Sequence, residues 1–70
     1  MIRFTTKNSK YEVTVQHNTF HVKKFEESNP ESMYIAVGQT TVSDYLDLQV
    51  GRYAAFGGVK TSTVISIEDV

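Results

Sequence analysis

The sequence predicts an all-β fold, a small β-barrel (SH3-like or similar) of six or seven short strands, with residues 1–70 forming a single β domain. Apolar and polar residues alternate along most of the chain, which is typical of strands with one buried face. Turn-forming residues recur at short intervals, and 70 residues leave no room for a second domain. Short strands with closely spaced turns favour a barrel that closes or half closes its own sheet.

The first 25 residues predict three strands with apolar side chains at every second position, at about 2–5, 11–15 and 20–25, separated by turns at 7–9 and 16–18. In the third strand Phe25 falls out of phase with Phe20 and Val22. A bulge near Lys23-Lys24 would return Phe25 to the apolar face. We therefore expect these aromatic residues in the core: Phe4, Tyr11, Phe20 and Phe25.

A loop follows at 27–31, where Pro30 removes a backbone donor. Beyond it, the alternation of Met33, Ile35 and Val37 predicts a fourth strand that ends at Gly38.

Residues 43–56 allow two interpretations. Ser43 or Asp44 could cap a helix that Gly57-Gly58 would end, which would make the fold α+β with one helix at about 43–56. Against this, apolar residues alternate with polar ones from 46 to 50, and Gly51 inside a helix would cost about 1 kcal/mol. We favour a strand to Val50, a turn at 51–52 and a strand at 53–56.

The stretch Phe56-Gly-Gly-Val-Lys-Thr-Ser-Thr63 resembles a phosphate-binding loop at first sight. Such a loop needs the spacing G-x-x-x-x-G-K-[ST] and a following helix, whereas here a valine separates the glycines from Lys60 and a strand follows. A two-residue hairpin turn at Gly57-Gly58 explains the glycines instead. The last strand, 59–67, should place Thr61, Thr63, Ile65 and Ile67 on one face, and a surface anion contact by Lys60 with the hydroxyls of Thr61 and Ser62 remains open.

Composition and motifs favour a binding protein over an enzyme. The chain has no cysteine, so it has no disulfide and no thiolate metal site. His17 and His21 would lie about 13 Å apart on one strand, too far to share a metal ion unless the chain turns at Asn18, in which case Glu12 could be a third ligand. No Gly-x-Ser-x-Gly element occurs. We expect no catalytic residue, no cofactor and no metal. No signal peptide or membrane span is visible, which predicts a soluble, cytoplasmic protein.

Charge and tyrosines suggest where binding could occur. The net charge is −1, yet residues 1–24 carry five basic side chains against one acidic side chain. Tyr34 and Tyr45 fall opposite the apolar phase and should be exposed, where tyrosine beside a cation can stack a base or anchor a protein interface. The candidate binding residues are Lys23, Lys24, Tyr34, Tyr45, Arg52 and Lys60. Apolar Ala36, Ala54, Phe56 and Val64 on the other phase, with a thin core, favour a homo-oligomer.

The segments MIRFTTKNSKYEV, LQVGRYAAF and TSTVISIEDV together resemble small β-rich proteins encoded in bacteriophages and prophages, although Thr63 stands where such proteins usually have proline. This resemblance implies a phage-related accessory or anti-defence protein, in the host cytoplasm, that occupies or sequesters a host protein or a small signalling ligand. Two alternatives remain open. One is a nucleic-acid-binding barrel that uses the basic N-terminal half, which we do not favour, and the other is a minor virion or assembly component.

Overall fold

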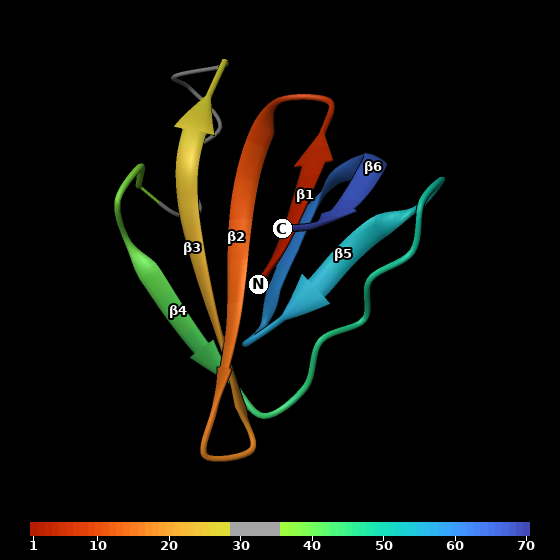
Figure 1. The fold of residues 1–70 in the computed structure, drawn as a ribbon. Helices are drawn as coiled ribbons and strands as arrows, with labels where there is room; N and C mark the ends of the chain where they lie inside the picture. The colour runs from red at the N-terminus through yellow and green to blue at the C-terminus, as the bar shows by residue number, and fades with distance from the viewer. Residues whose placement is uncertain (29–35) are drawn as a thin grey trace.

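The structure, a computed structural model, describes residues 1–28 and 36–70. Within these residues, six antiparallel strands form one sheet in the order β4-β3-β2-β1-β6-β5, which curls into a nearly closed barrel (Figure 1). The strands are β1 (Ile2–Thr6), β2 (Ser9–Gln16), β3 (Thr19–Glu27), β4 (Thr40–Ser43), β5 (Tyr53–Phe56) and β6 (Val59–Asp69). The predicted all-β barrel is confirmed. The alternative helix at 43–56 does not form, and the described residues contain no helix that could cross a membrane.

The barrel closes where the turn between β5 and β6 meets the end of β4. The backbone N–H of Gly57 donates to Ser43 Oγ at 2.9 Å, and that of Gly58 donates to Tyr45 Oη at 2.9 Å. Gly57 and Gly58 have φ angles of 52° and 79°, as a tight hairpin turn requires. The predicted glycine turn is therefore confirmed, and its side-chain partners hold the two edges of the sheet together.

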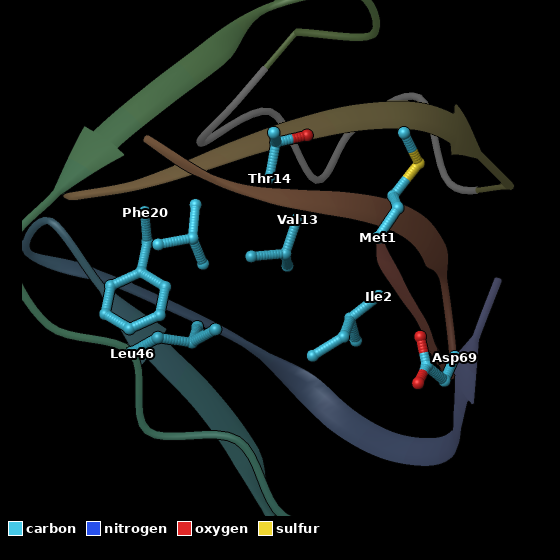
Figure 2. A pocket seen from close by; sticks show the side chains of 8 residues that line it. Met1, Ile2, Val13, Thr14, Phe20, Leu46 and Asp69 are labelled. Atoms are coloured by element: carbon cyan, nitrogen blue, oxygen red, sulfur yellow. The ribbon is translucent and has the colours of Figure 1, made fainter. Parts of the chain in front are cut away.

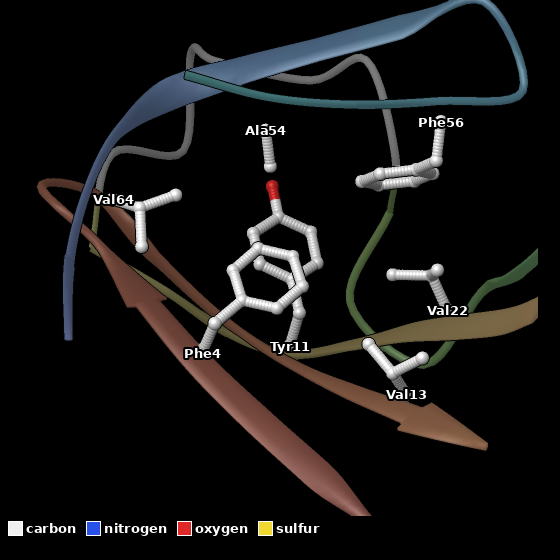
Figure 3. Packing of buried hydrophobic residues seen from close by; sticks show 7 residues of the cluster. All are labelled: Phe4, Tyr11, Val13, Val22, Ala54, Phe56 and Val64. Carbon is white, nitrogen blue, oxygen red and sulfur yellow. The ribbon is translucent and has the colours of Figure 1, made fainter. Parts of the chain in front are cut away.

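The core lies between the β1-β2-β3 layer and the β5-β6 hairpin (Figure 3). The rings of Phe4 and Tyr11 stack with centroids 4.8 Å apart, and Phe56 meets Tyr11 edge-on at 6.1 Å. Such aromatic pairs contribute about 0.5–1.5 kcal/mol beyond the area they bury. The inner-face residues of the hairpin are fully buried: Ala54, Phe56 and Val64. They complete the core of a single chain, so the expectation that self-association covers them was wrong, while Ala36 is exposed.

A bulge interrupts β3, as predicted, but its effect is the reverse of the prediction. Tyr11 pairs with Lys24 and Lys10 pairs with Glu26, which leaves Phe25 as the extra residue. Phe25 therefore lies on the outer face, with the guanidinium carbon of Arg3 5.5 Å from its ring centroid. Lys24 takes the inner position that was expected for Phe25. The reason is that the inward phase of Val22 continues to Lys24, and the bulge comes only after it.

The segment between β3 and β5 departs furthest from the prediction. Residues 33–35 lie outside the described residues, residues 36–37 are not in a strand, and β4 begins at Thr40. The expected strand to Val50 does not form either, since Asp47 makes only an isolated bridge to Ala55. Leu46 and Leu48 nevertheless pack against the core from this loop. The turn at Gly51, with φ 96°, and the strand at 53–56 are confirmed.

In β6 the buried residue is Val64, whereas Ile65 and Ile67 are exposed. The pairing of β6 with β1 shifts register between Thr5 and Thr6, which face Ser66 and Val64. Ile65 is left over at this irregularity. The last strand is thus confirmed. Ile65 does not share the inner face with Val64, whereas Ile67 pairs with the buried Phe4 and returns to the inner phase near the end of the strand.

Candidate functional site

Lys24, predicted as a surface cation, is buried inside the barrel. Its ammonium forms an ion pair with the Glu27 carboxylate, and the two side chains are only 2% and 5% exposed. Ser9 Oγ also donates to Glu27 Oε1 at 2.7 Å. A cation enclosed in this way has no access to an external ligand, so Lys24 serves the fold and not a binding surface.

Two of the four remaining basic residues of the N-terminal half pair with carboxylates on the outer face of the sheet. Arg3 lies 3.3 Å from Glu12, and Lys10 lies 3.4 Å from Glu26. Lys7 and Lys23 are exposed. Binding to nucleic acid relies on several cations that neutralise phosphates. The paired carboxylates divide the basic surface, which weakens the nucleic-acid alternative.

Arg52 and Lys60, two of the predicted binding residues, come together around Tyr53, which was not among them. The Tyr53 ring centroid lies 5.6 Å from the Arg52 guanidinium carbon and 5.4 Å from Lys60 Nζ. Arg52 also pairs with Asp47 at 3.5 Å. Contacts of this kind at exposed sites are worth about 0.5–1 kcal/mol each. The Tyr53 ring therefore already contacts two cations of its own chain, which would compete with an external ligand for the ring.

The other predicted contacts near this hairpin are only partly in place. Tyr45 is exposed as predicted, at 46%, and its hydroxyl accepts the hydrogen bond from Gly58. The Thr61 hydroxyl accepts from the Ala54 N–H at 3.0 Å, and Ser62 Oγ accepts from Asn8 Nδ2 at 2.9 Å. These hydroxyls have structural partners, which leaves Lys60 without the anion-binding companions that the sequence suggested. Tyr34 lies outside the described residues.

A pocket of about 460 Å³ opens at one end of the barrel (Figure 2), and the sequence analysis did not predict it. Its walls come from β1, β2, β3, the end of β6 and the loop after β4, and the lining residues are Met1, Ile2, Val13, Thr14, Val15, Phe20, Leu46 and Asp69. Figure 2 places Phe20 and Leu46 at one end of the pocket and Met1 and Asp69 at the other.

The pocket follows from unequal strand lengths. β2 and β3 have 8 and 9 residues, while β4 and β5 have 4 each. Near the β2–β3 turn, β2 and β3 are therefore longer than the strands opposite them, and their inner-face residues stay uncovered. Val15, for example, continues the inner phase of Val13 but is 60% exposed. Alternation marks these residues as core. It carries no information about how far the opposite strands reach.

In size and lining the pocket is typical of a binding site. Ligand pockets are commonly about 300–1,000 Å³, mainly apolar, with a few polar groups that fix orientation. Here the polar groups are Thr14 and Asp69. Among residues 1–28 and 36–70, no three histidine, cysteine or acidic side chains gather to hold a metal ion. Comparison with protein-family models, with curated proteins and with solved structures finds no match for this chain.

Proposed function

We propose that this chain is a small non-enzymatic binding protein whose ligand places an apolar group in the pocket at the open end of the barrel. The observation that carries the proposal is an apolar pocket built on paired strands, where inner-face side chains such as Val15 and Phe20 stay in contact with solvent. Covering such surface is favourable, by roughly 0.8 kcal/mol for each methylene group buried. The strands are already held by the ladder and the core, so binding orders little of the chain.

The biological setting that we propose is that of a phage-type accessory or anti-defence protein, which occupies or sequesters its target. The resemblance of both ends of the chain and of residues 48–56 to small phage and prophage proteins supports this setting. Neighbouring genes would test it directly. Defence-related or counter-defence genes beside this one would support the role, whereas morphogenesis genes would favour a virion component.

The pocket itself can be tested with n-hexanol as an uncharged apolar probe. In ¹H–¹⁵N correlation spectra of the full chain, we expect hexanol to shift amide signals around the pocket, at Ile2, Val13, Phe20 and Leu46. Val15→Trp should fill the pocket from an exposed position and weaken these shifts. Val42→Trp is the matched control, because Val42 is similarly exposed, at 56%, and does not line the pocket. Shifts scattered over the whole barrel, or equal in both variants, would contradict the proposal.

A further inference from the structure

Asp69 is the one acidic residue among those that line the pocket. It pairs across the sheet with Ile2, so both residues have the same phase, and Figure 2 shows the Asp69 carboxylate at the end of the pocket beside Ile2. Glu68 has the opposite phase, pairs with Arg3, and lines a separate hollow on the outer face with Arg3 and Phe25. Two neighbouring carboxylates therefore belong to different surfaces.

Glu12, Glu26, Glu27 and Asp47 each lie within 4.0 Å of a cationic side chain, whereas Asp69, like Glu68 and Asp44, has no such partner among residues 1–28 and 36–70. Glu12 pairs with Arg3, Glu26 with Lys10, and Glu27 with Lys24. Asp69 is exposed, so solvent screens its interaction with a cation and the gain from such a pair is modest. Asp69 thus places a solvent-exposed negative charge at one end of the pocket.

We infer that the ligand of this pocket is a small organic cation of the alkylamine or arylamine class, with its apolar part toward Phe20 and Leu46 and its ammonium group at Asp69. This inference rests on the proposed function. Three features match that chemistry: the apolar wall, the position of the carboxylate at the opposite end of the pocket from Phe20 and Leu46, and the scarcity of other polar groups in the lining. At this end of the pocket, Asp69 would repel the head group of an anionic ligand.

The experiment compares three probes of equal chain length that differ in the charge of the head group: n-hexylamine, n-hexanol and hexanoate. Amide shifts of the full chain are followed at pH 7 and constant ionic strength, where the amine is protonated and the acid is ionised. We expect hexylamine to bind about three-fold to five-fold more tightly than hexanol, in line with a partly exposed ion pair, and hexanoate to bind most weakly. Raising the salt concentration should reduce the difference between the probes.

Asp69→Asn should make the three affinities similar, while Glu68→Gln removes the same charge from the other face and should leave the order of the probes unchanged. Equal affinities in the parent protein, or tightest binding of hexanoate, would overturn the inference while leaving an apolar binding site in place. If none of the three probes shifts the pocket signals, both this inference and the proposed function fail.

Discussion

At the scale of single residues, the inner face of this barrel holds an ion pair that the pattern of apolar residues does not reveal. The bulge after Lys24 places Lys24 and Glu27 inside, and Ser9 adds a hydrogen bond to the same carboxylate. Enclosed charges lose their hydration, and their mutual attraction repays this only when both partners are present. The intact pair therefore adds little net stability, whereas the loss of either partner should destabilise the fold.

Lys24→Met should destabilise the protein by about 3–5 kcal/mol, because it leaves the Glu27 carboxylate enclosed without its cation. Urea unfolding followed by circular dichroism measures this change. Lys23→Met is the control, since Lys23 is exposed on the neighbouring position and should change stability little.

The double variant Lys24→Met/Glu27→Leu keeps this prediction testable if the single variant does not fold. Removing both charges should recover most of the loss, although Ser9 would then lack its acceptor. A double variant that is no more stable than Lys24→Met would show that the charge left on Glu27 is not the cause.

At the scale of elements, the local sequence was sufficient to predict a strand where the strand and its turn are neighbours in the chain. The alternation in β1 and β2, and the hairpin from Tyr53 through Gly57-Gly58 into β6, were predictable because each signal lies within the element itself. β4 and the segment after it were not. Residues 46–50 alternate like a strand, yet backbone pairing needs a partner at the right distance, and only Asp47 finds one, at Ala55.

The candidate site was harder to predict than the fold for the same reason. Val13, Val15 and Phe20 read as core residues, yet all three line the pocket, because β4 and β5 are too short to cover this end of the sheet. Lys24 reads as a surface cation from its residue type, although the alternation of Phe20 and Val22 continues to it, and the position of the bulge after Lys24 decides that it lies inside. Both properties depend on contacts between distant parts of the chain, which a pattern along the sequence does not contain.

The two glycines of the β5–β6 turn should differ in their tolerance of substitution. Both have positive φ, so Gly58→Ala should cost about 1–2 kcal/mol through backbone strain. A Cβ at Gly57 would lie 2.9 Å from Thr41 Cγ2, whereas one at Gly58 meets nothing within 4 Å. Gly57→Ala should therefore be more destabilising than Gly58→Ala.

Thermal or urea unfolding of the two alanine variants, side by side, tests this comparison. Thr41→Ser in the Gly57→Ala background removes the contacting methyl group and should recover part of the difference. Equal stability of the two single variants would argue that the turn does not press against β4 as the structure has it.

At the scale of the whole molecule, the core is completed within one chain, which changes the reason to expect self-association. Ala54, Phe56 and Val64 are buried within the single chain, so they give no reason to expect a second copy. Large apolar side chains remain exposed beside the pocket, however, including Met1 and Val15, and the backbone N–H of Val70 donates to the Met1 carbonyl at 2.9 Å, which keeps Val70 near the same end. Contiguous apolar surface of this kind favours association.

We expect light scattering coupled to size exclusion to give a mass of at least twice 7.9 kDa for the parent protein at a protein concentration on the order of 50 μM, falling on dilution. If the open end of the barrel forms the contact, Val15→Lys should yield a monomer, because it places a charge at the centre of the apolar surface. Val42→Lys, at an exposed position away from the pocket, should leave the larger species intact. A parent protein that runs as a monomer of 7.9 kDa at this concentration would contradict self-association.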